Sequence, residues 1–178
     1  AVLLFYDLDN LKEFYEKKIK NKIIKNTLTR WWETKLTPTE IIEYSEDYNY
    51  LTIAAHPYSR ILVRKTWNFN KIENIKKLHA LEILNSASPM FDNKKVEQIA
   101  KKLNKPGVAG SDAHLLENIG KAGIEIETNS NEETLNNIKK GKIQVKGRSF
   151  NTIERTRYVT KIAKNNALEY LSKNILKR

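Results

Sequence analysis

Cysteine is absent from this 178-residue sequence. Its absence excludes disulfides, thiolate zinc fingers, iron–sulfur sites and cysteine nucleophiles, so a bound metal would need nitrogen or oxygen ligands. Long apolar runs are also lacking, because the longest, from Ala1 to Tyr6, is far short of the roughly 20 residues that span a bilayer. No secretory signal opens the chain. We therefore expect a soluble, cytoplasmic protein with no membrane partner.

Acidic residues are scarce near the end of the chain. Residues 1–138 carry 20 Lys/Arg and 19 Asp/Glu, whereas residues 139–178 carry 12 and 2, so the net charge of +11 lies almost wholly in the tail. Such a tail can steer phosphate-bearing substrates or bind nucleic acid. It can equally be a helix packed on the body with its lysines in solvent. Packing is favoured by an apolar row spaced by four residues: Val159, Ala163, Ala167, Leu171 and Ile175.

Short apolar, often β-branched runs alternate with helix-like segments along the chain. This order predicts a parallel α/β fold, in which buried strands are joined by helices. The expected strands are residues 1–6, 51–55, 80–84, 108–109, 123–127 and 143–146.

Helix start signals stand between these strands. Thr37, followed by proline and then by glutamate three residues on, predicts a capped helix. Asp92 is expected to cap a helix over 93–103, and Ser130 one that stops at Gly141. The tail from about residue 151 to residue 176 predicts one long helix.

Three residues suited to metal binding follow two of the expected strands. His56 closes the run 51–55, and Asp112 and His114 follow Val108–Ser111. Strands of a parallel α/β barrel end at one mouth, where their following residues meet. Imidazole and carboxylate suit zinc, manganese or iron, and Gly110 permits a close backbone approach. A structural role for each histidine is the simpler alternative, and the remaining one, His79, is expected to be a solvated residue before a strand.

The motifs at these positions resemble those of the PHP (polymerase and histidinol phosphatase) family. Residues 55–57, Ala-His-Pro after an apolar strand, resemble one family motif, and residues 80–85 resemble its "aiEvfN" strand. Residues 110–114, Gly-Ser-Asp-Ala-His, match its last metal motif letter for letter. The order and spacing also fit small archaeal-type PHP proteins. The resemblance covers about residues 1–147.

The resemblance implies a distorted (β/α)7 TIM-like barrel with two or three divalent ions (Zn, Mn or Fe) at its mouth. It implies that His56, Asp112 and His114 are metal ligands, with Asp112 and His114 also catalytic. Phosphoester hydrolysis by activated water would follow, with a phosphate ester as substrate. Arg60 in the loop after His56 suits phosphate recognition, and Asn85 is expected to line the site. Glu82 is expected to be structural.

The family's opening His-x-His strand and its following histidine and glutamate ligands have no counterpart here. The sequence also starts at Ala1 within an expected strand. We therefore expect residues 1–147 to be the C-terminal portion of a barrel, residues 148–178 to be a basic helical tail, and the missing ligands to come from an upstream segment, a separate N-terminal half or an oligomer.

Three hypotheses remain open. The first is a metal-dependent phosphoesterase whose isolated 178-residue chain binds metal weakly and has negligible activity. The second is a degenerate, non-catalytic PHP-like module that binds nucleic acid or a protein through its basic tail. The third is an unrelated α/β protein with chance motifs, which would have to explain three motifs in the right order.

Overall fold

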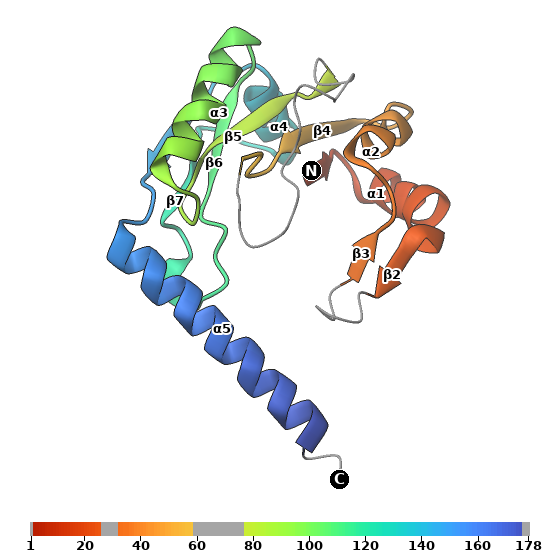
Figure 1. The fold of residues 1–178 in the computed structure, drawn as a ribbon. Coiled ribbons are helices and arrows are strands. Elements are labelled where there is room, and N and C mark those ends of the chain that lie inside the picture. Colours follow the sequence, from red (N-terminus) through yellow and green to blue (C-terminus); the bar gives the residue numbers. More distant parts are fainter. Residues whose placement is uncertain (1, 26–31, 59–76, 176–178) are drawn as a thin grey trace.

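The computed structural model describes residues 2–25, 32–58 and 77–175. Its elements form a mixed α/β fold (Figure 1). The strands are β1 (Val2–Phe5), β2 (Ile23–Lys25), β3 (Trp32–Thr34), β4 (Tyr50–Ala54), β5 (Ala80–Asn85), β6 (Gly107–Gly110), β7 (Ala122–Glu125) and β8 (Gln144–Gly147). The α-helices are α1 (Leu8–Phe14), α2 (Pro38–Ser45), α3 (Met90–Lys102), α4 (Asn131–Lys139) and α5 (Thr152–Ile175). Shorter helical turns are η1 (Tyr15–Ile19), η2 (Lys20–Lys22) and η4 (Leu116–Asn118).

The central sheet has four strands in the order β1-β4-β5-β6. β4, β5 and β6 are parallel, as expected, whereas β1 runs antiparallel to β4. The direction of β1 follows from the path of the chain, because Phe5 at the end of β1 pairs with Tyr50 at the start of β4. The intervening residues leave and re-enter the sheet at the same end, and they form the lobe that holds α1, β2, β3 and α2 (Figure 1).

A closed barrel is not formed by the described residues. β7 and β8 pair with each other as a separate antiparallel ribbon instead of extending the central sheet. The expectation of a TIM-like barrel is therefore not confirmed. The coarser expectation of an α/β fold is confirmed. All six expected strands are present, with ends shifted by one or two residues.

Both faces of the central sheet are buried. On one face, Leu81 packs with Ile42 of α2 and with Val96 and Ala100 of α3. On the other face, Ala80 and its neighbours pack against Leu135 and Ile138 of α4. Adjacent residues of a strand point to opposite faces, so the apolar run of β5 serves both layers. Each fully buried leucine or isoleucine contributes about 1.5–3 kcal/mol, and this packing holds the ends of β4 and β6 in place.

Most of the expected helix signals are confirmed. Thr37 and Glu40 form a reciprocal capping box at α2, and the Ser130 hydroxyl accepts the Glu133 N–H at α4. The helix start expected at Asp92 is wrong, because α3 begins at Met90 with Pro89 as its N-cap. Proline is tolerated at a helix start because a backbone N–H there has no partner within the helix. Asp92 instead lies inside the first turn and is 1% exposed.

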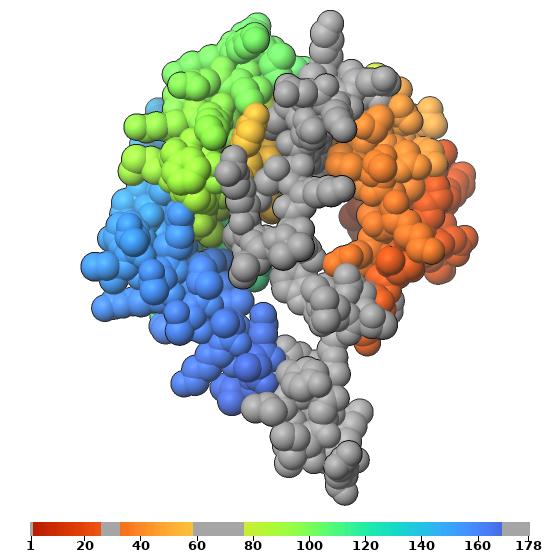
Figure 2. Space-filling model, viewed as in Figure 1, coloured from red at the N-terminus to blue at the C-terminus, as the bar shows by residue number. Residues whose placement is uncertain are grey.

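The basic tail forms α5, as expected, and its first turns pack on the body. Tyr158 is 4% exposed and packs with Phe150 and Ala87, with Ile162 half-buried beside them. In the space-filling view the blue surface of α5 continues from the green surface of α3 (Figure 2). The apolar row expected to pack, which starts at Val159, does not do so where its side chains are described. Val159 is 44% exposed, and Ala163 and Ala167 are exposed too.

The described part of the chain contains no helix that is both long and apolar enough to cross a membrane.

Candidate functional site

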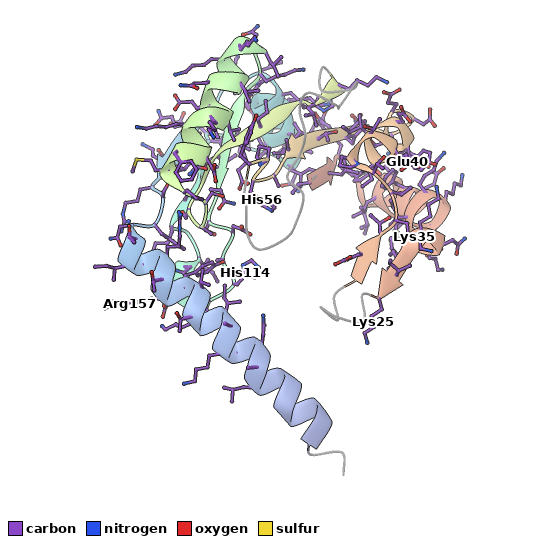
Figure 3. The ribbon with its side chains drawn as sticks, in the orientation of Figure 1. Lys25, Lys35, Glu40, His56, His114 and Arg157 are labelled. Carbon is purple, nitrogen blue, oxygen red and sulfur yellow. The ribbon has the colours of Figure 1, made fainter. Side chains whose placement is uncertain are left out.

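The candidate metal ligands lie at one edge of the central sheet. His56 follows β4, and Asp112 and His114 follow β6, with β5 between these two strands. Because the three strands are parallel, their C-terminal ends meet at this edge. Both imidazoles project from it toward the same side of the molecule (Figure 3), and both side chains are exposed.

Two of these residues have an unusual backbone. Three non-glycine residues of the described part have φ in the left-handed region, and His56 (+29°) and Asp112 (+49°) are two of them. Such a conformation costs of the order of 1–3 kcal/mol, and it persists only where surrounding contacts hold it. Both motif loops are therefore held by their surroundings in a costly geometry.

Glu82 on β5 holds the His56 turn. The His56 N–H donates to Glu82 Oε2 at 2.5 Å, and the Asn85 side-chain amide donates to the same oxygen at 3.2 Å. Glu82 is 9% exposed, and burial raises the pKa of its carboxyl, with the nearby Asp112 carboxylate adding to the shift. The side chain expected to be structural thus lies between the two motif loops.

Gly110 allows the β6 loop to approach Glu82. A Cβ atom at this position would stand 2.5 Å from Glu82 Oε1, which is closer than real Cβ contacts come. The close approach expected at Gly110 is confirmed, and its partner is the Glu82 carboxyl. A side chain at residue 110 would force the Glu82 carboxyl out of this position.

Tyr158 of α5 holds the other loop. Its hydroxyl donates to the Asp112 carbonyl oxygen at 2.6 Å, and it lies 2.6 Å from His114 Nδ1. His114 Nδ1 is also 3.0 Å from the Asp112 carbonyl oxygen. Burial and the nearby Asp112 carboxylate raise the pKa of the Tyr158 hydroxyl, so it keeps its proton at neutral pH.

The start of α5 is tied to the loop after β5. The Phe150 N–H donates to the Ser86 carbonyl at 2.8 Å, and the Ser86 hydroxyl donates to the Arg148 carbonyl at 3.0 Å. Further along, Lys161 and Glu117 of η4 form an ion pair at 2.7 Å. These contacts on both sides place Tyr158 against the 110–114 loop.

Two residues of the expected substrate site have different outcomes. Arg60 lies outside the described residues. Asn85 is fully buried, with its side-chain oxygen accepting the Ser88 N–H and its amide bound to Glu82. Asn85 lies at the strand end, as expected, but its buried side chain bonds to Glu82 and Ser88. Its contact with substrate stays a prediction.

His79 was expected to be solvated, but this expectation is wrong. The side chain is half-buried against β4. Its Nδ1 accepts the Thr52 N–H at 3.0 Å. Burial lowers the pKa of His79 to about 4, and the charges of Lys139 and Lys105 add to the effect. The ring is therefore neutral at physiological pH and belongs to the fold, away from the 110–114 loop.

Tyr158 is the residue of the site that sequence reasoning missed. The apolar row chosen for α5 began at Val159, one residue away, so it placed the buried face about a quarter turn off. The spacing of Tyr158 and Ile162, both large and four residues apart, is the signal that marks the packed face.

The donor set fits a divalent metal in type but not in number. His56, Asp112 and His114 supply the nitrogen and oxygen donors that zinc, manganese and iron accept. Within residues 2–25, 32–58 and 77–175, no group of three or more His, Asp or Glu side chains is placed to hold a metal ion together. These residues therefore supply suitable donor types but no assembled metal shell.

One family model matches this part of the chain. Residues 91–143 match the family described as PHP-associated, and the matched segment contains the whole 110–114 motif. The match confirms the predicted PHP resemblance for this C-terminal region, which is less than half of the chain. No curated protein and no solved structure was found to match the sequence.

Proposed function

We propose that the edge formed by β4, β5 and β6 is part of a divalent-metal phosphoesterase centre of the PHP type. The observation that carries the proposal is the 110–114 loop, which lies within the PHP-associated match and follows β6 at the sheet edge where the parallel strand β4 also ends. A buried carboxyl, Glu82, braces the neighbouring His56 turn. Rigidly held polar groups at strand ends are typical of catalytic sites in α/β proteins.

The chain's own residues would hold and orient the metal. His56, Asp112 and His114 are the proposed ligands for Zn, Mn or Fe. When bound, the metal would activate water and neutralise phosphoryl oxygens of a phosphate ester. Asp112 would also orient that water. Arg60 and Asn85 remain the proposed substrate-binding residues.

Further ligands are part of the proposal. A catalytic metal ion typically has three protein ligands and an open position for water, so a centre with two or three ions needs more donors than His56, Asp112 and His114 supply. We propose that an upstream segment, a separate N-terminal half or a second copy supplies them and completes a (β/α)7 barrel. Three parallel strands that carry motif residues at their C-terminal ends support this arrangement.

The experiment compares nitrophenyl phosphate hydrolysis by the 178-residue chain with that of the chain joined to the residues encoded upstream of Ala1. We expect negligible turnover for the first and Mn²⁺-dependent turnover for the second, lost in Asp112→Asn and kept in the exposed control Asp47→Asn. Hydrolysis that is absent from the extended protein, or that survives Asp112→Asn, would overturn the proposal.

The alternative function, a non-catalytic module that binds nucleic acid or a protein partner through the tail, has less support. Several tail cations are already in ion pairs: Lys146 with Glu125, Arg148 with Glu154, and Lys161 with Glu117. An upstream sequence without His-x-His after a strand would favour this alternative over the enzyme.

A further inference from the structure

The Tyr158 hydroxyl, the His114 ring and the Asp112 carbonyl form a closed triangle of contacts. The hydroxyl oxygen is 2.6 Å from both the Asp112 carbonyl oxygen and His114 Nδ1, and the third side measures 3.0 Å. Tyr158 is 4% exposed, so its hydroxyl has little access to water as a hydrogen-bond partner. The protons of this triangle can be assigned from the donors and acceptors alone.

A carbonyl oxygen only accepts hydrogen bonds, and a phenol has one proton to donate. The short contact between the Tyr158 oxygen and the Asp112 carbonyl therefore uses the phenolic proton. The Tyr158 oxygen then accepts from His114, so Nδ1 must carry the imidazole proton. The opposite tautomer would leave Nδ1 and the Asp112 carbonyl as two acceptors facing each other. One assignment satisfies all three contacts.

We propose that Tyr158 is a positioning residue, which fixes His114 in the tautomer with its proton on Nδ1 and so makes Nε2 the ring nitrogen that can bind a divalent cation. Histidine ligands of metals commonly donate their second ring N–H to an oxygen, which sets both tautomer and ring orientation. Through Tyr158, the basic tail helix α5 would thus contribute to the geometry of the metal site. The tautomer itself does not depend on the proposed function; the use of Nε2 by a metal does.

The direct test is the tautomer in the metal-free chain. Long-range ¹H–¹⁵N correlation spectra of the imidazoles, recorded near pH 8.5 where ordinary histidines are neutral, distinguish a protonated Nδ1 from a protonated Nε2. The chain has only three histidines, and a His114→Gln variant identifies the signals of this ring. We expect wild-type His114 to be almost wholly protonated on Nδ1.

Tyr158→Phe removes the hydroxyl and keeps the ring that packs on Phe150, whose centroid is 5.2 Å away. We expect this variant to populate both tautomers of His114. Tyr6→Phe is the matched control, because it also deletes one hydroxyl bond, to Asn136 at 2.8 Å, outside the 110–114 loop. A His114 proton on Nε2 in the wild type, or an unchanged tautomer in Tyr158→Phe, would overturn the inference.

A Zn²⁺ titration of the same proteins separates this inference from the proposed function. We expect Tyr158→Phe to weaken Zn²⁺ binding by about 10–100-fold, and Tyr6→Phe to leave it unchanged. No Zn²⁺ binding by the wild type, with His114 protonated on Nδ1, would refute the metal site and uphold the tautomer. Wild-type binding that is unaffected by Tyr158→Phe would refute the positioning role and leave the metal site standing.

Discussion

The backbone N–H of His56 donates to the side chain of Glu82 at 2.5 Å, from the end of one strand to the middle of the next. His56 has a φ of +29°, so its turn would relax without a partner for this N–H. Glu82 also accepts from Asn85 and faces Gly110 across a gap too small for a Cβ. One buried carboxyl thus sets the spacing of both motif loops.

Removing this carboxyl is expected to destabilise the fold. In Glu82→Ala the His56 N–H and the Asn85 amide lose their shared acceptor, at a cost of about 2–3 kcal/mol in the free energy of unfolding. Glu82→Gln keeps an acceptor oxygen, and we expect a loss below about 1 kcal/mol. Urea denaturation followed by circular dichroism measures both.

The control for this comparison is Glu97→Ala. Glu97 pairs with Lys101 on the exposed face of α3 at 2.7 Å, and such pairs contribute less than about 0.5 kcal/mol. Equal stabilities for Glu82→Ala and Glu97→Ala would show that Glu82 does not brace the His56 turn.

His79 is expected to make the fold sensitive to mild acid. Its pKa is about 4 in the folded chain and about 6.5 when unfolded. The unfolded chain therefore takes up the proton first, and stability falls as the pH drops from about 6.5 to 4. Because the ring is half exposed, we expect a contribution of about 1–2 kcal/mol.

The measurement compares the free energy of unfolding at pH 7 and pH 4.5 for the wild type and His79→Gln. The glutamine oxygen can accept the Thr52 N–H but does not titrate in this range. The wild type should lose about 1–2 kcal/mol more than the variant on acidification. Parallel losses in the two proteins would contradict the assignment.

Glu154 is expected to titrate far below an ordinary glutamate. Its carboxylate accepts two bonds from Arg148, each at 2.6 Å, and the Asn151 N–H at 2.9 Å, which lower its pKa to about 2. It stabilises the start of α5 above the unfolded pKa of about 4.3, and this contribution is lost as the pH falls toward 2.

An NMR titration of the Glu154 side chain tests this directly. The midpoint should lie near 2 in the wild type and rise toward about 4.3 in Arg148→Gln. Arg157→Gln, on the same helix, is the control and should leave the midpoint near 2. A wild-type midpoint near 4.3 would show that the Arg148 pair does not form.

Nucleic-acid binding by the tail is expected to be weak and only shallowly dependent on salt. Each phosphate contact made by a cation to a single strand adds about 0.7 to the slope of log affinity against log salt. Lys146, Arg148 and Lys161 are already in ion pairs, and the first turns of α5 pack on the body, so we expect no more than about four phosphate contacts and a slope no steeper than about −3. A slope near −6 by fluorescence anisotropy would favour the binding-module alternative.

Local features of this fold were predictable from the sequence because the residues that form them are neighbours. The cap at Thr37 joins residues three apart, and the strand runs are buried on both faces. The direction of β1 was not predictable, since it depends on how the chain returns to the sheet at Tyr50.

In the candidate site too, the motif residues were predictable from the sequence, and the residues that hold them in place were not. His56, Asp112 and His114 were recognisable as motif residues at strand ends. The contacts that hold them join residues far apart in sequence: Glu82 is 26 positions from His56, and Tyr158 is 44 positions from His114. No local pattern marks such partners, so they emerge only from the packing of β5 and α5 against the motif loops.

The central claim, a divalent-metal site at the ends of β4 and β6, is tested most directly by Mn²⁺ binding to the 178-residue chain, followed by electron paramagnetic resonance. We expect weak binding that His56→Ala and Asp112→Ala each reduce by more than about 10-fold, since even outer partners of a metal site contribute that much. The exposed control Asp47→Ala should bind like the wild type. Binding that is absent from the wild type, or unchanged in both site variants, would contradict the claim.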